Sequence, residues 1–295
     1  MTRFALPACS RSGLTALALL AAASAAAQWP EGTSATSAEL LAPEWNDGPR
    51  HPHAPRWPAA ADWIGGSGED AAWQPISPDA EGRYSHEALW GATLRMSVES
   101  ESGRTVMLRA AGLGRAVFNG SLRFGETYRE GAWWIPVRIE AGANEWILSP
   151  RMGQTWAPEL RSPRAPIELF TGDLTLPMAE PGSTGPLAAS VALANTTTET
   201  IRGASIRAAW QGGELVTPLP DLPPLMIRKD AFDIAPPALD ADRATSLTIE
   251  LLAPDGSVWD RGGSTKLAAT EANDLRVRTF RSRNDDTVQK YAERP

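Results

Sequence analysis

The residue types that most often carry enzymatic chemistry are scarce in this chain. Its 295 residues include three histidines, His51, His53 and His86, and one cysteine, Cys9. A single cysteine allows neither an intrachain disulfide nor a thiolate metal cluster. The nearest approach to a Gly-x-Ser-x-Gly elbow, at residues 65–69, ends in Glu where the strained turn needs a small residue. We therefore predict no catalytic residue, no metal site and no cofactor.

Aromatic residues offer a different chemistry, which is carbohydrate binding. The chain has 12 tryptophans, and an indole ring stacks well on the apolar face of a sugar. Neighbouring residues of a strand point to opposite faces, so one ring of an adjacent pair should be buried. Trp146 alternates with Leu148 and is also expected in the core. The candidate ligand-binding residues are Trp133, Trp134, Trp156 and Tyr128.

The charge and the N-terminal segment indicate where the protein works. The net charge is −7, which argues against nucleic acid as the main partner. In residues 1–27, Arg3 and Arg11 precede an apolar run and Ala-x-Ala triplets, the order of a secretory signal peptide. The run, residues 14–27, is shorter than the ~20 residues of a membrane span. We expect a secreted or periplasmic protein without a membrane span after signal cleavage.

The elements that must position any site are β-strands. Residues 28–58 are rich in Pro, Ala, Ser and Thr and are expected to form a linker. Apolar residues then alternate with polar ones, as in 94–98 and 135–139, which is typical of strands with one buried face. Asn119-Gly120 favours a type I′ hairpin turn. Residues 59–166 are predicted to form a β-sandwich or jelly roll.

A second alternating series predicts a second sandwich over residues 167–272. Apolar positions recur in 187–193, 206–210 and 247–251, with turn residues such as Gly212-Gly213 and Pro254-Asp255-Gly256 between them. Their spacing indicates an immunoglobulin-like sandwich. The Cys-Trp-Cys hallmark is missing, so this inference concerns the fold class only.

The first predicted sandwich resembles a known superfamily. Residues 116–120 (AVFNG), 125–128 (GETY), 134–137 (WIPV) and 141–148 (AGANEWIL) are similar to the jelly-roll domain of galactose-binding-like proteins. The resemblance implies the fold, but many members of that superfamily are structural, so it does not imply a function.

The C-terminal segment, residues 273–295, carries a second resemblance. Its residues are similar to the entry into the catalytic domain of secreted prolyl-oligopeptidase-like α/β-hydrolases, although Asp286 and Thr287 replace an expected Gly and Ser. The resemblance implies that the segment is a hairpin beginning an α/β-hydrolase domain, with every catalytic residue downstream. The matching positions are Phe280, Ser282, Asp285, Val288, Gln289, Tyr291 and Pro295.

Two functions follow from these observations. The first is a non-catalytic accessory region of a secreted serine esterase or peptidase, which docks substrate or shields the active site of a downstream α/β-hydrolase domain. The alternative is an independent carbohydrate-binding module with a polysaccharide as partner. A row of exposed aromatic rings on a sandwich face would favour the second, and an apolar patch beside the C-terminal hairpin the first.

Overall fold

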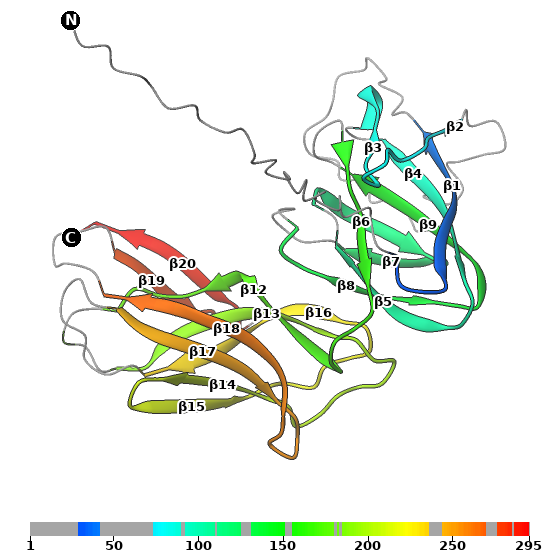
Figure 1. Cartoon of the computed structure of the whole chain (residues 1–295). Coiled ribbons are helices and arrows are strands. Elements are labelled where there is room, and N and C mark those ends of the chain that lie inside the picture. The colour runs from blue at the N-terminus through cyan, green and yellow to red at the C-terminus, as the bar shows by residue number, and fades with distance from the viewer. Residues whose placement is uncertain are drawn as a thin grey trace, which may run out of the picture.

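The structure is a computed structural model. It describes residues 29–41, 73–89, 92–109, 111–124, 131–150, 155–179, 182, 185–235, 244–269, 276–284 and 286–294. The predicted signal peptide and Tyr128 lie outside these residues. The described residues form strands with one short 3-10 helix, η1 (Glu87–Leu89), and none of their helices is long and apolar enough to cross a membrane. Figure 1 shows two bodies of strands joined between β11 and β12.

The first body is built from two main antiparallel sheets. The larger has the order β2-β1-β4-β9-β6-β7 and the smaller the order β11-β5-β8, with β3 and β10 paired separately. The strands are β1 (Thr33–Leu41), β2 (Gln74–Pro75), β3 (Tyr84–Ser85), β4 (Thr93–Ser100), β5 (Arg104–Arg109), β6 (Leu113–Phe118), β7 (Ser121–Phe124), β8 (Ile135–Ile139), β9 (Gly142–Pro150), β10 (Thr155–Trp156) and β11 (Glu159–Arg161).

The core of this body follows the alternation of its strands. Leu94, Met96 and Val98 of β4 are at most 1% exposed, and Trp146 of β9 is fully buried as predicted. The turn between β6 and β7 has positive φ at both Asn119 (47°) and Gly120 (79°), as a type I′ turn requires. Local turn chemistry and period-two burial therefore account for this sandwich.

Residues 33–41 differ from the expectation of a linker, because they form β1. This strand pairs with β4 over its whole length and carries a register shift between Ala35 and Ser37. Its inward positions include Ala38 and Leu40, but its other residues are mostly Ser, Thr and Ala. A strand with so few large apolar residues is stabilised by pairing with its neighbour more than by burial of its own side chains. Its composition therefore did not indicate a strand.

The second body is a seven-stranded sandwich. Its sheets have the orders β12-β13-β16 and β15-β14-β17-β18, and its core includes Phe232, Ile206 and Ile249. The fold class predicted from the sequence, all-β with two successive sandwiches, is confirmed. The strands are β12 (Ile167–Thr175), β13 (Leu187–Asn195), β14 (Ser205–Trp210), β15 (Gly213–Pro218), β16 (Ile227–Ile234), β17 (Ala244–Leu252) and β18 (Val258–Ala268).

The C-terminal hairpin is a two-stranded sheet of its own, made of β19 (Arg276–Arg281) and β20 (Val288–Glu293). It is attached to the second sandwich. The amide of Met178 donates to the carbonyl of Val277 at 2.8 Å, and the Thr279 hydroxyl donates to the carbonyl of Ala188 at 2.6 Å. The opposite face exposes Phe280 and Tyr291, whose ring centroids are 6.2 Å apart.

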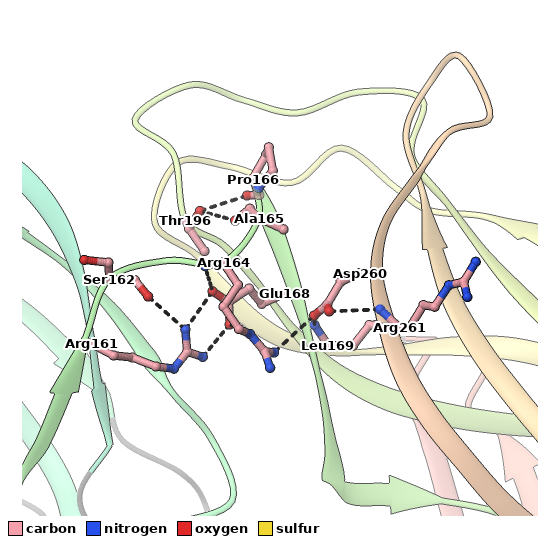
Figure 2. Close-up of polar contacts among 10 residues, drawn as sticks. All are labelled: Arg161, Ser162, Arg164, Ala165, Pro166, Glu168, Leu169, Thr196, Asp260 and Arg261. Atoms are coloured by element: carbon pink, nitrogen blue, oxygen red, sulfur yellow. Dashed lines mark hydrogen bonds and ion pairs between the residues drawn. The ribbon is translucent and has the colours of Figure 1, made fainter.

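A buried carboxylate organises the joint between the two sandwiches (Figure 2). Glu168 of β12 has a fully buried side chain and accepts hydrogen bonds from Arg161 Nη1 at 2.9 Å and from the Arg164 amide at 2.6 Å. Arg164 also reaches Asp260 of β18 at 3.2 Å. Burial alone raises the pKa of Glu168, but the hydrogen bonds and charges of the two arginines outweigh it and hold the pKa below its ordinary value. The joint is therefore held by a charged carboxylate with well-satisfied oxygens.

Candidate functional site

The first sandwich is hollowed beside the beginning of β1. The hollow has a volume of about 260 Å³ and is lined by Trp29, Ser34, Ala35, Pro78, Asp79, Ala80, Gly82, Tyr84 and Pro158. It thus collects the segment before β1, the turn before β3, and the link between β10 and β11. Three stretches far apart in the sequence meet there, so folding alone creates the site.

Trp29 supplies the aromatic wall. Its indole is partly exposed and packs on the core of the sandwich. Its ring centroid lies 6.1 Å from that of the fully buried Trp146, which meets Phe118 edge-on at 5.2 Å. Because the buried Trp146 ring, itself packed on Phe118, lies against it, Trp29 is held in place before any ligand arrives.

Asp79 supplies a fixed carboxylate at the edge of the hollow. Its Oδ1 accepts hydrogen bonds from the amides of Glu81 (3.0 Å) and Arg83 (2.9 Å), and its Oδ2 accepts one from Arg83 Nε at 2.9 Å. The hydrogen bond from the Arg83 amide, followed by those of the Arg83 side chain, lowers the pKa of Asp79. Gly82, at φ 77°, closes this turn. The carboxylate is therefore charged at neutral pH and can accept hydrogen bonds from hydroxyl groups.

Tyr84 lies beneath the hollow and belongs to the core. It is 3% exposed and its ring centroid is 6.2 Å from that of Trp156, its cross-strand partner. Burial raises the pKa of Tyr84, so the phenol is protonated at neutral pH. The hollow thus combines an aromatic wall, an apolar floor and a carboxylate.

A second hollow of about 390 Å³ adjoins the first through Ser34, and its lining includes Thr33, Glu99 and Glu101. Ser34 and Glu99 face each other across β1 and β4. The Glu101 amide donates to the carbonyl of Gly32 at 3.0 Å, and a Cβ added at Gly32 would lie 2.7 Å from Glu101 Oε2. Glycine at this position therefore leaves room for the Glu101 carboxylate.

Arg104 fixes the segment that joins the two hollows. Its Nη2 donates to the carbonyl of Glu31 and to the Thr33 hydroxyl. The turn is closed by a hydrogen bond of 3.0 Å from the Thr33 amide to the carbonyl of Pro30. The chain between Trp29 and β1 is thus anchored to β5.

These groups offer an aromatic face and a charged hydrogen-bond acceptor. A general acid at neutral pH needs a raised pKa, whereas that of Asp79 is lowered. Among the residues that the structure describes, no three His, Cys, Asp or Glu side chains are grouped to hold a metal ion. An aromatic face beside fixed hydrogen-bond acceptors is the chemistry that recognises a sugar ring.

The structure places Trp133 and Trp134 at the joint between the sandwiches. Both are partly buried and pack around Met107, Phe170, Ala192 and Ala194. Trp133 Nε1 donates to Asp173 Oδ2 at 2.9 Å. The Arg161 guanidinium lies 4.3 Å from the centre of the Trp134 ring. The two rings are thus engaged in packing, hydrogen bonding and cation–π contact within the protein.

The other aromatic candidates are not brought into the hollow as an exposed wall. Trp156 is 2% exposed, and Tyr128 lies outside the described residues. As ligand-binding residues, all four candidates stay a prediction. Trp29 was missed because it stands alone in a stretch that composition marked as a linker. The sequence held no signal for it, because the strand that begins four residues later at Thr33 was not indicated by composition either.

The described surface carries no row of aromatic rings on a sandwich face. Its exposed large apolar residues are Leu122, Val216, Val258, Phe280 and Tyr291. Only Phe280 and Tyr291 form an aromatic pair among them, and they lie on the hairpin. In the described part of the chain, the hollow beside Trp29 is a place where an aromatic ring and a carboxylate border the same concave surface.

No family model and no curated protein matches the sequence. Solved structures that resemble the chain include a candidate β-galactosidase from Bacteroides fragilis, at 14% identity and a TM-score of 0.39, covering 89% of this chain and 43% of that one. Another is a family 2 β-galacturonidase from Eisenbergiella tayi bound to glycerol. It has 12% identity and a TM-score of 0.34, and the match covers 87% of this chain and 45% of that one. A third is a Bacteroides uniformis β-glucuronidase. It has 12% identity and a TM-score of 0.36, and the match covers 80% of this chain and 32% of that one.

The chain spans less than half of the length of each of these proteins.

The comparisons correct the resemblance to prolyl-oligopeptidase-like hydrolases, which is wrong. The structures that the chain matches are glycoside hydrolases. The motif describes a hairpin, and the segment shares that geometry: Phe280 pairs with Gln289 and Arg278 with Tyr291. Asp286 adopts the positive φ of 61° for which the motif expects Gly. The motif thus encodes the geometry of a turn, and the accessory role for a serine esterase or peptidase has no remaining basis.

Proposed function

We propose that this protein is an exported carbohydrate-binding β-sandwich protein that takes a sugar ring into the hollow beside Trp29. The observation that carries the proposal is the meeting of the partly exposed Trp29 indole with the Asp79 carboxylate across a hollow of about 260 Å³. The indole would stack on the C–H face of the ring, and Asp79 and the Ser34 hydroxyl would bind its hydroxyl groups.

Preorganisation supports this assignment. The Trp146 ring supports Trp29. Two amides and a guanidinium hold Asp79, and Arg104 anchors the segment between Trp29 and β1. A ligand that enters such a site orders few side chains, so little affinity is lost to conformational entropy. The adjoining hollow would extend the site to a second sugar unit.

The test is affinity electrophoresis of the purified protein in gels that contain soluble polysaccharides, with pull-down on insoluble ones. We expect at least one polysaccharide to retard the wild-type protein. Trp29→Ala should weaken binding by about 2 kcal/mol, or roughly thirtyfold. Trp259→Ala is the matched control, because Trp259 is a partly exposed tryptophan that packs on the second sandwich.

Circular dichroism and thermal unfolding must show that both variants fold. Asp79→Asn gives a second perturbation that keeps the shape of the hollow while removing its charge. Lack of retardation on every polysaccharide, or equal retention of folded Trp29→Ala, would overturn the proposal.

A further inference from the structure

The charged side chains on the described linings of the two hollows are all carboxylates. Asp79 borders the first hollow, and Glu99 and Glu101 border the second. Among the residues that the structure describes, neither lining contains Lys, Arg or His. Because the hollows share Ser34, a ligand that fills both meets carboxylates along its length.

Two arginines beside the hollows already interact with other groups of the protein. Arg83 is paired with both Asp79 and Glu81 at 2.9 Å. Arg104 donates to the carbonyl of Glu31 and to the Thr33 hydroxyl, on the β5 side of the segment. The charged side chains on the described linings are the carboxylates of Asp79, Glu99 and Glu101, so the linings are negative.

Glu99 and Glu101 are the two carboxylates best placed to act on a ligand. Both are exposed and lie two residues apart at the end of β4 and just beyond it. Alternation along the strand points Glu99 to the same face as Ser34, its cross-strand partner. An acidic sugar would meet repulsion here, and a neutral sugar would gain hydrogen bonds only.

We propose that this site selects sugars that carry a protonated amine, such as glucosamine units, over neutral and acidic sugars, an inference that rests on the proposed function. The ammonium group would lie over the second hollow against Glu99 and Glu101, while a neighbouring ring stacks on Trp29. One exposed ion pair changes an affinity by a few-fold, so two pairs give a preference of about tenfold, or about 1.4 kcal/mol.

The test uses three oligosaccharide series that share one β-1,4-linked gluco backbone. They are oligomers of glucosamine, of N-acetylglucosamine and of glucose, titrated by isothermal calorimetry into the full protein. We expect the glucosamine series to bind about tenfold more tightly than the glucose series. The advantage should shrink at high salt, because added ions screen exposed charges.

A charge-matched pair of double variants locates the effect. Glu99→Gln with Glu101→Gln removes two charges at the site. Glu199→Gln with Glu214→Gln removes two exposed charges from the second sandwich, so the net charge is the same. The first double variant should lose the preference, so that the glucosamine and glucose series bind with similar affinity, and the second should keep the wild-type preference.

The outcomes separate this inference from the proposed function. Equal binding of all three series leaves the proposed function in place and overturns the selectivity. Lack of binding by every series and every polysaccharide overturns both. A preference that survives Glu99→Gln with Glu101→Gln shows that other groups cause it and overturns the assignment to these residues.

Discussion

Replacing Glu168 by glutamine removes the charge of the buried carboxylate at the joint. Breaking one partner of a buried ion pair costs about 3–5 kcal/mol. Arg161 and Arg164 are 24% and 56% exposed and retain part of their hydration, and glutamine keeps one acceptor oxygen. We therefore expect Glu168→Gln to lower the free energy of unfolding by about 2 kcal/mol, with a larger loss for Glu168→Ala.

Thermal unfolding by calorimetry measures the effect. For a domain of this size, about 1 kcal/mol shifts Tm by about 4 °C or more, so Glu168→Gln should lower Tm by about 8 °C. Asp221→Asn is the matched control, since Asp221 pairs with Arg202 while both are mostly exposed, and such pairs contribute less than about 1 kcal/mol. A Tm of Glu168→Gln equal to that of Asp221→Asn would refute the reasoning.

The pH dependence gives an independent check. The folded-state pKa of Glu168 is lowered from its ordinary value of 4.5, so the folded state binds this proton more weakly than the unfolded state. The stabilisation is therefore present above pH 4.5 and is lost as the pH falls through the folded-state pKa. Wild-type protein should lose more stability than Glu168→Gln between neutral pH and that region, and parallel curves would contradict the assignment.

Three further predictions concern single positions, and thermal unfolding checks each. Burial raises the pKa of Asp230 although Arg228 partly offsets it, so Asp230→Asn should cost far less at pH 7 than Glu168→Gln, and an equal loss would count against this reading. Gly262→Ala should lower the free energy of unfolding by about 1–3 kcal/mol, because the added Cβ would lie 2.5 Å from Thr171 Cγ2. Gly185→Ala is the control and should be neutral, because its added Cβ meets nothing within 4 Å. Equal effects of the two substitutions would contradict the packing. Asn144→Ala should lower the free energy of unfolding by about 2–3 kcal/mol. The buried Asn144 side chain donates from Nδ2 to the carbonyls of Glu140 and Gly142 at 2.9 Å, and its Oδ1 accepts from the Glu140 amide at 2.8 Å. A loss of stability below about 0.5 kcal/mol would contradict this role.

Much of the fold could be predicted because its signals are local. Alternation located β4, β8 and β17, and Asn119-Gly120 placed a turn with two positive φ angles. β1 escaped prediction because its residues are small and polar, and only its pairing with β4 makes it a strand. A local sequence pattern reflects a segment's own preference for a strand or a turn. It does not show which distant strand will pair with that segment.

The candidate site could not be predicted because it is made by contacts between distant segments. Trp29 contacts Trp146, and the turn at Asp79 closes over the same hollow. The cluster of tryptophans drew attention to Trp133 and Trp134, which the structure places at the joint. An aromatic residue does not reveal from sequence whether it will face a ligand or another domain.

The most direct measurement of the central claim is a crystal structure of the protein with a bound oligosaccharide, chosen from the series that retards it in gels. We predict a sugar ring stacked on Trp29, with hydroxyl groups bound by Asp79 and Ser34. A ligand seated on Phe280 and Tyr291 of the hairpin instead, or an empty hollow at saturating ligand, would contradict the account.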